Sequence, residues 1–129
     1  DAAFAYVIAH EVGHHVQTML GTLGKVHNLQ QQVGKTESNA LSVKLELQAD
    51  CYAGVWGYYA QKDGLFEDGD IEEAYMAAEA VGDDTLQQRA QGYTVPHTYT
   101  HGTSAERKKW LQRGLQTGDI NQCNTFAAR

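Results

Sequence analysis

Two histidines four residues apart, His10 and His14, lie inside the first apolar-periodic segment of the chain. The apolar side chains of this segment recur at helical spacing, at Phe4, Val7, Ile8, Val12, Val16, Met19 and Leu20. The spacing predicts one mostly buried helix over residues 2–20, closed by Gly21 and Gly24. Because buried imidazoles without a partner cost free energy, the fold has to bring a partner to this helix.

A metal ion is the partner that the pattern His10-Glu11-Val12-Gly13-His14 favours. On a helix, residues four apart share a face, so both imidazoles can bind one Zn²⁺ ion at about 2.0–2.1 Å. Glu11 lies beside such a metal, where a general base can take a proton from an activated water. His15 lies about 100° further round the helix, so we expect it outside the ligand set. The alternative is a solvated or core histidine pair.

Two carboxylates on a second long helix supply the missing ligand. The pattern predicts this helix from about Ser38 to Gln61, with Glu46 and Asp50 on one face. A catalytic zinc takes three protein ligands and leaves one position for water, and buried carboxylates need a positive charge nearby. We therefore predict Glu46 as the third ligand and Asp50 as the acceptor of a hydrogen bond from a ligand histidine. The alternative is a solvated acidic pair.

Small residues predict that another backbone comes close to the second long helix. Ala49, Ala53 and Gly57 fall at successive i,i+4 positions and form a smooth strip on the face that carries Glu46. Gly13 lies about 60° round its helix from His10, where the missing side chain would help to bring Glu46 to the metal.

The rest of the chain also has helical patterns. Residues 25–33 fit a short surface helix, but the flanking glycines make this region loop-like overall. A helix is expected from a capping box at Asp70 and Glu73 to residue 80, and a shorter one from residue 83 or 84 to 91. A loop follows over residues 92–102. A second capping box, residues 103–106, begins a helix whose inner face is Trp110, Leu111 and Leu115. Because no convincing strand pattern occurs, we predict a mostly α fold of four or five helices.

Composition bounds the remaining possibilities. The 129 residues suit one domain, and a net charge of −6 argues against a nucleic-acid partner. The chain as given has neither a transmembrane run nor a signal peptide, and its helical beginning leads us to expect an upstream part in the natural protein. Two cysteines are too few for a disulfide framework. Cys51 is either a small buried residue or bonded to Cys123 or to an upstream cysteine.

The combined motifs resemble a known family. His10-Glu11-x-x-His14 followed by Glu46-x-x-x-Asp50 resembles the gluzincin signature of thermolysin-type zinc peptidases. A closer resemblance is to the bacterial neutral zinc metallopeptidase family (YpfJ-like), and it is carried by four blocks that span nearly the whole chain. These blocks are residues 9–17, 45–51, 100–104 and 118–123.

This resemblance implies a zinc peptidase acting on a peptide or protein. It implies Zn²⁺ at His10, His14 and Glu46, Glu11 as general base, and Asp50 orienting a ligand histidine. It also implies a compact gluzincin-like helical core, with residues 1–129 as a single catalytic domain in the C-terminal part of a longer protein. Membrane anchors or export signals upstream, a cell-envelope location and disulfide-bonded cysteines would follow.

Some related gluzincins carry a histidine, and an arginine six residues later, that face the metal. His101 and Arg107 have this spacing, so the resemblance implies that His101 stabilises the oxyanion of the tetrahedral intermediate, with Tyr99 as a rival donor. The alternative role for His101 is a loop residue that fixes the cap of the last helix. His97 is assigned no catalytic role.

Two rival functions remain beside a zinc endopeptidase. One is a non-proteolytic zinc-binding scaffold or adaptor of the cell envelope, and the other is a metal-free helical interaction domain. The intact Glu11 favours the enzyme, because a purely structural zinc site more often has four protein ligands. Gluzincins usually place an edge strand before the first metal-binding helix. This chain offers none, which puts substrate binding by these residues alone in doubt.

Overall fold

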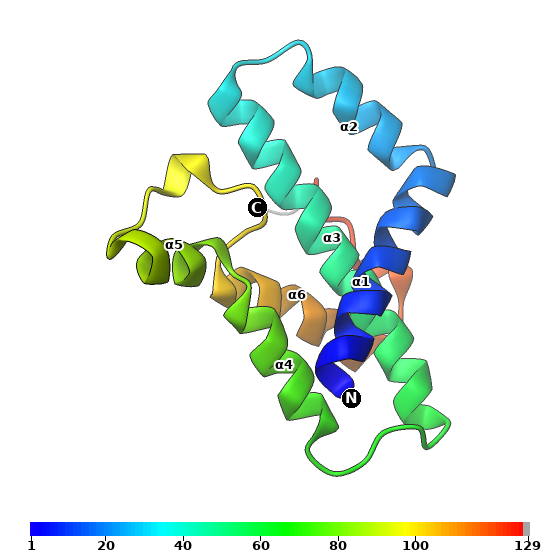
Figure 1. Ribbon diagram of the computed structural model, residues 1–129. Helices are drawn as coiled ribbons and strands as arrows, with labels where there is room; N and C mark the ends of the chain where they lie inside the picture. Colours follow the sequence, from blue (N-terminus) through cyan, green and yellow to red (C-terminus); the bar gives the residue numbers. More distant parts are fainter. Residues whose placement is uncertain (128–129) are drawn as a thin grey trace.

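Six α-helices form most of the protein. The structure is a computed structural model that describes residues 1–127 (Figure 1). The helices are α1 (Ala2–Met19), α2 (Thr22–Gln30), α3 (Lys35–Lys62), α4 (Asp70–Ala80), α5 (Asp83–Gln91) and α6 (Ser104–Thr117). No strand occurs in the described residues. The prediction of a mostly α fold is confirmed. The number of helices exceeds the predicted four or five because the two short polar segments, α2 and α5, are both helical.

The longest helix, α3, is the centre of the fold. It packs most extensively against α6 and α1, and α4 contacts both of those helices (Figure 1). The crossing of α3 and α6 depends on Gly54 and Gly114: a Cβ atom added to Gly54 would lie 2.9 Å from the Gly114 Cα. The predicted close packing along α3 is therefore present, and it offsets the low helix propensity of glycine.

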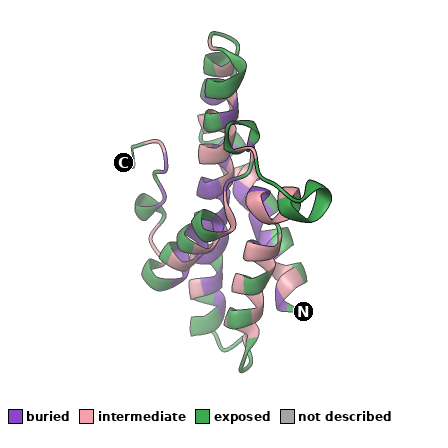
Figure 2. Ribbon diagram, turned by 90° about the vertical axis from the view of Figure 1, so that its left-hand side faces the viewer, coloured by how far each residue is buried: buried purple, intermediate pink, exposed green. Residues whose placement is uncertain are grey.

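Two groups of buried side chains make up the core. One lies between α1, α3, α4 and α6 and consists of Tyr6, Ala9, Ala53, Ala78, Leu111 and Leu115. The other consists of Leu47, Cys51, Trp110 and Cys123. Figure 2 shows buried residues concentrated where the helices meet, whereas the outer ends of the long helices are exposed.

A disulfide joins Cys51 of α3 to Cys123, which decides between the alternatives that the sequence left open. Both cysteines are fully buried. The segment after α6 is also tied to α3 by polar contacts: the Thr125 hydroxyl donates to the Lys44 carbonyl at 2.6 Å, and Gln48 Nε2 donates to the Cys123 carbonyl at 3.0 Å. The end of the described chain is therefore fastened along α3.

The prediction that α1 is mostly buried is wrong. Its apolar stripe is largely exposed, with Phe4 at 66% and Val12 at 55% exposure, and the buried face carries Tyr6, His10 and Gln17. The polar face is buried because it is the one that meets α3. The outer face helps to line an apolar groove of about 360 Å³. Its walls are Ile8, Ala9, Val12, Gly13, Val16, Tyr52, Val55, Trp56 and Ile120.

The two predicted capping boxes have different outcomes. At α6, the Thr103 hydroxyl accepts from the Glu106 N–H, and the Glu106 carboxylate accepts from the Thr103 N–H, as predicted. At α4 the box is absent because Gly69, with φ of 88°, is the residue before the helix, and Asp70 is already inside it. The Glu73 carboxylate accepts instead from the Ala2 N–H of α1 at 3.3 Å.

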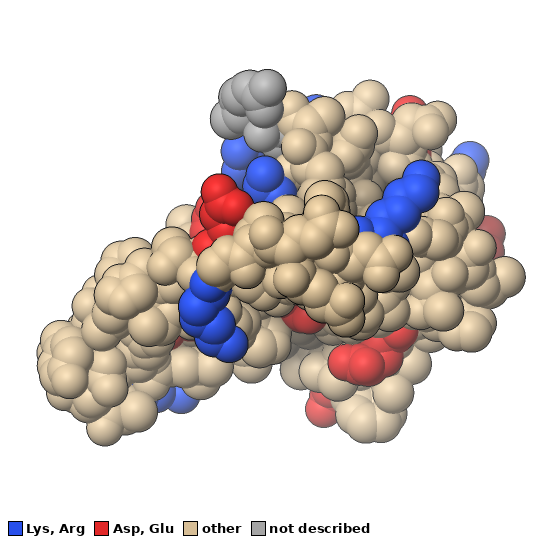
Figure 3. Space-filling view, turned by 90° about the horizontal axis from the view of Figure 1, so that it is seen from above, with Lys and Arg blue, Asp and Glu red and all other residues tan. Residues whose placement is uncertain are grey.

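The outer surface carries charges of both signs. On the face in Figure 3, Lys and Arg side chains are scattered over several places, some of them beside Asp or Glu, and form no continuous stripe. Among the described residues, no helix is both long and apolar enough to cross a membrane.

Candidate metal centre

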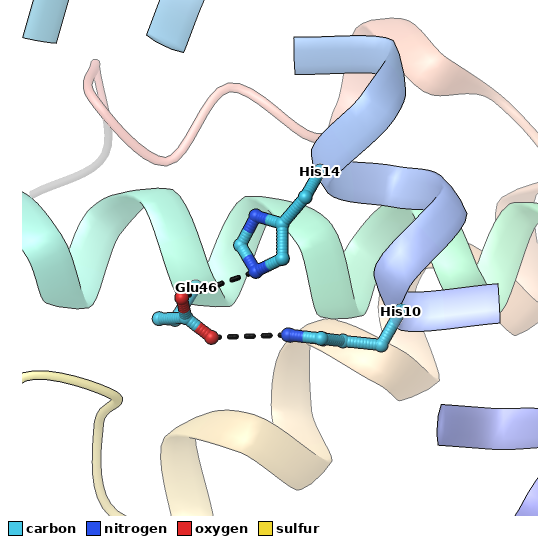
Figure 4. A group of neighbouring side chains, drawn as sticks. All are labelled: His10, His14 and Glu46. Atoms are coloured by element: carbon cyan, nitrogen blue, oxygen red, sulfur yellow. Dashed lines mark hydrogen bonds and ion pairs between the residues drawn. The ribbon is translucent and has the colours of Figure 1, made fainter. Parts of the chain in front are cut away.

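His10, His14 and Glu46 converge between α1 and α3. Both histidines project from one face of α1 toward the Glu46 carboxylate (Figure 4). His10 Nε2 lies 3.0 Å from Glu46 Oε1, and His14 Nε2 lies 3.1 Å from Oε2. Two ligands about 2.1 Å from a tetrahedral ion stand about 3.4 Å apart. The three side chains are therefore close to the spacing that one zinc ion requires, and no other group of three potential metal ligands occurs within residues 1–127.

Asp50 fixes the outer nitrogen of His10. Its carboxylate is fully buried and accepts from His10 Nδ1 at 2.7 Å and from the Tyr6 hydroxyl at 2.6 Å. Arg107 completes the cluster, with Nε donating to Oδ2 at 2.8 Å and Nη2 donating to Oδ1 at 3.1 Å. Because an ionised carboxylate only accepts hydrogen bonds, the proton of neutral His10 lies on Nδ1.

Gln17 fixes the outer nitrogen of His14 in the same way. Its Oε1 lies 2.8 Å from His14 Nδ1, and its Nε2 donates to the Leu45 carbonyl at 2.8 Å. The amide oxygen therefore faces the histidine, and His14 Nδ1 is the donor. Each of the two histidines thus has its outer nitrogen held by a buried side chain, as is usual for metal-binding histidines.

The chemistry of these atoms fits a metal ion. With both histidines protonated on Nδ1, two Nε2 lone pairs and a carboxylate face one another within a group whose ligand atoms lie within 4.8 Å. Such a set of electron-rich atoms needs a positive charge beside it, which either a bound metal ion or protonation of a histidine supplies. Histidine nitrogen and carboxylate oxygen are ligands that zinc accepts, and three protein ligands leave its fourth position open.

The ionisation of these groups reflects the same arrangement. Burial lowers the pKa of His10, but hydrogen bonds to Asp50 and Glu46 outweigh burial and raise it to about 9. Hydrogen bonding to Glu46 also raises the pKa of His14. Burial would raise the pKa of the Glu46 carboxyl, yet its histidine partners hold it well below the usual range. The centre therefore favours negative carboxylates facing a cation.

A cavity of about 500 Å³ opens beside the three ligands, and Glu11 and His101 both line it. Glu11 is exposed there, one residue after His10 on α1. The His101 side chain is about half exposed, and its Nδ1 lies 2.9 Å from the Thr100 hydroxyl. The structure thus places the predicted base and one predicted oxyanion donor at the same opening.

Arg107 and Tyr99 differ from the sequence expectation. Arg107 lines the cavity, but its guanidinium is bound to Asp50 and to the Val81 carbonyl, because the buried carboxylate requires a positive partner. Tyr99 does not line this cavity and faces two others. The turn before it is held against α3, where Asn39 Nδ2 donates to the His97 carbonyl at 3.2 Å, and this carries the tyrosine away from the ligands.

Gly13 allows α1 to approach α3. A Cβ atom at this position would lie 2.9 Å from the Ala49 carbonyl oxygen and 3.1 Å from the Ala49 Cα. The absence of a side chain therefore lets His10, His14 and Glu46 meet, as the sequence led us to expect. His15 is exposed and is not in the ligand group.

Sequence reasoning missed Tyr6 and Gln17. Both lie on the buried face of α1, four residues before His10 and three after His14. Their signal was available in the helical spacing, because polar residues on the ligand face are the natural partners of the ligands. The apolar residues of α1 mask this signal, because an apolar stripe normally marks the buried face of a helix.

The family model described as "Putative neutral zinc metallopeptidase" matches residues 1–126. The chain belongs to this family. The family's description names zinc, and this agrees with the group of His10, His14 and Glu46, whose side chains could hold a metal ion.

Two similar relatives illustrate the extent of the match. The uncharacterized protein YpfJ of Escherichia coli (strain K12) is 59% identical over 126 residues, which are 98% of this chain and 44% of YpfJ. The uncharacterized protein Mb2605 of Mycobacterium bovis is 50% identical over 133 residues, covering 95% of this chain and 44% of that protein. The chain therefore spans less than half the length of these relatives. No solved structure gave a significant match.

Proposed function

We propose that the protein is a zinc-dependent peptidase, with His10, His14 and Glu46 holding the metal and Glu11 acting as general base. The observation that carries this proposal is the convergence of two Nε2 atoms and one carboxylate beside an open cavity that Glu11 also lines. A structural zinc site would more often use four protein ligands and enclose them.

A bound zinc ion would polarise the scissile carbonyl and lower the pKa of the attacking water. Glu11 is exposed in the same cavity, so its carboxylate can accept a proton from that water and return it to the leaving amine. Neither ligand histidine can take this role, because Asp50 and Gln17 occupy their outer nitrogens.

His101 is the proposed oxyanion donor. Its ring lines the cavity and is about half exposed. Its Nδ1 lies 3.7 Å from Asp83 Oδ1, but the Asp83 carboxylate also accepts from three backbone N–H groups, so the ring can turn toward a substrate without leaving Asp83 unpaired. Tyr99 is withdrawn as a rival because it faces other cavities. Arg107 acts through Asp50, whose orientation it fixes.

We also propose that the protein works in the cell envelope. The Cys51–Cys123 disulfide supports this, because disulfides persist in oxidising compartments and are rare in the cytosol. Alkylation of free thiols in intact cells, before and after reduction, tests it. We expect both cysteines to be protected until reductant is added, and ready alkylation without reductant would contradict the location.

The decisive experiment compares metal content and cleavage in the same samples. We expect about one zinc equivalent in the parent protein, cleavage of some members of a peptide library, and loss of cleavage with a chelator. Glu11→Gln should keep the zinc and lose cleavage by a factor on the order of 10² to 10⁴. Glu37→Gln, at an exposed glutamate in the first turn of α3, is the matched control and should behave as the parent.

Each other outcome identifies a different function. Zinc without cleavage, in both this chain and a full-length relative, would favour a zinc-binding scaffold or adaptor. Protein that holds no zinc and is not destabilised by chelator would favour a metal-free interaction domain. Equal cleavage by the parent and Glu11→Gln would remove Glu11 as the base.

A further inference from the structure

Two buried glutamines connect the metal-site histidine His14 to the disulfide. His14 Nδ1 lies 2.8 Å from Gln17 Oε1, Gln17 Nε2 lies 2.9 Å from Gln48 Oε1, and Gln48 Nε2 lies 3.0 Å from the Cys123 carbonyl oxygen. Gln17 is fully buried, Gln48 is 6% exposed, and Cys123 is fully buried. The four residues therefore form a continuous hydrogen-bonded chain that is shielded from solvent except at His14, whose side chain is 25% exposed.

The direction of the hydrogen bonds along these four residues is fixed at the Cys123 end. A backbone carbonyl can only accept, so the Gln48 amide group donates to Cys123 and turns its oxygen toward Gln17. Gln17 then donates one N–H to Gln48 and the other to the Leu45 carbonyl, which also only accepts. Both N–H groups of Gln17 are used, so its oxygen is left for His14, and His14 must donate from Nδ1.

We propose that Gln17 and Gln48 are positioning residues for metal binding, through which the disulfide-anchored Cys123 carbonyl holds His14 in its Nδ1–H tautomer with Nε2 free for the metal. This inference rests on the proposed zinc site. The opposite tautomer would leave the Gln17 oxygen facing a bare nitrogen lone pair in a buried place, which is costly.

The same contacts set the register of the two ligand helices. Leu45 and Gln48 flank Glu46 on α3, so Gln17 ties the ring of His14 to the turn that presents Glu46. The hydrogen-bonded chain therefore fixes the separation between two metal ligands as well as the protonation of one. Loss of either glutamine should weaken metal binding without removing a ligand.

Zinc affinity, measured by competition with a chelator, tests this directly. Gln17→Met should weaken zinc binding about 10- to 100-fold, as loss of a ligand's hydrogen-bond partner typically does. Gln48→Met should weaken it less, and Gln17→Glu should restore part of the loss because a carboxylate still accepts from His14. Gln30→Met is the matched control: Gln30 also donates to a backbone carbonyl and a side chain of α3 and lies on α2, away from the proposed metal ligands. Its affinity should be unchanged.

Nuclear magnetic resonance of the zinc-loaded protein supplies a second measurement, which would not change if the glutamines only stabilised the fold. The parent should show a slowly exchanging Nδ1–H of His14, assigned by its absence in His14→Ala. That signal should exchange faster in Gln17→Met and Gln48→Met and be unaffected in Gln30→Met. Circular dichroism reports whether each variant is folded. If Gln17→Met does not fold, the zinc affinities of Gln48→Met and Gln17→Glu decide whether the glutamines position His14.

The outcomes separate the two proposals. A parent protein that binds no zinc contradicts the proposed function. A parent that binds zinc, with folded glutamine variants that bind equally tightly and keep the His14 signal, overturns the positioning role alone.

Discussion

Arg107 and Asp50 form a two-point ion pair that is almost completely buried. Nε lies 2.8 Å from Oδ2 and Nη2 lies 3.1 Å from Oδ1, with Asp50 fully buried and Arg107 at 4% exposure. The pair links α6 to the turn of α3 that follows Glu46. Through Asp50 it also holds His10, so the last helix supports the metal centre without contributing a proposed ligand.

Removing the arginine should destabilise the fold strongly. Arg107→Met would leave the Asp50 carboxylate buried without its main positive partner, which typically costs about 3–5 kcal/mol. Urea unfolding monitored by circular dichroism measures this change in the free energy of unfolding. Arg89→Met, at an exposed arginine of α5, should change it by less than about 0.5 kcal/mol. Similar small losses for both variants would show that the buried pair contributes little.

Acid should weaken the protein through Asp50. Burial would raise the pKa of this carboxyl, but hydrogen bonds from His10 and Arg107 lower it below its ordinary value of 3.8. A lowered folded-state pKa means that stability is present above 3.8 and is lost as the pH falls through that value toward the folded one. Asp50→Asn should therefore make the pH dependence of stability in acid shallower, by up to about 1.4 kcal/mol per pH unit.

Unfolding titrations between neutral pH and strong acid check this prediction. Asp68→Asn, at an exposed aspartate between α3 and α4, serves as the control and should follow the parent curve. Parallel curves for Asp50→Asn and the parent would contradict a role for this carboxylate in acid unfolding.

Adding one methyl group at Gly13 should push the ligand helices apart. Its Cβ would lie 2.9 Å from the Ala49 carbonyl oxygen, so Gly13→Ala should destabilise the fold by about 1–3 kcal/mol and lower zinc affinity. Gly24→Ala is the matched control, because Gly24 is also helical and nothing lies within 4 Å of its added Cβ. That control should be as stable as the parent or up to about 1 kcal/mol more stable. Unfolding and chelator competition measure both effects, and an unaltered Gly13→Ala protein would disprove the tight approach.

Reducing the disulfide should cost about 4 kcal/mol in the free energy of unfolding, because Cys51 and Cys123 are 72 residues apart and reduction frees a long loop in the unfolded chain. Unfolding with and without reductant measures this cost. The double variant Cys51→Ala with Cys123→Ala should unfold at the same denaturant concentration in both conditions. An effect of reductant on that variant would mean that the loss has another source.

Local patterns were the most predictable part of the fold. The Thr103 capping box depends on neighbouring residues alone, and so does the i,i+4 placement of His10 with His14. The helix predicted from Asp70 to residue 80 is present as α4, but its predicted capping box is absent, because Gly69 precedes the helix in a left-handed conformation and Asp70 lies inside it.

Contacts between distant elements were less predictable. The spacing of His101 and Arg107 led us to expect both at the metal, but a buried carboxylate attracts a guanidinium more strongly than an open cavity does, so Arg107 is bound to Asp50. The inner face of α1 was misjudged for a similar reason. An apolar stripe normally marks the buried face, yet in α1 the buried face is the one that carries the partners of Asp50 and Glu46.

The position of the disulfide also decides what one cut in the chain would do. The turn between α3 and α4 is largely exposed, which makes it a natural site for a protease. Cleavage there would leave one piece carrying His10, His14 and Glu46 and another carrying Arg107. Because the cut falls between Cys51 and Cys123, the pieces would stay covalently joined. A nicked molecule would thus run as two fragments on a gel only after reduction, and would keep its metal-site residues attached to the helix that supports them.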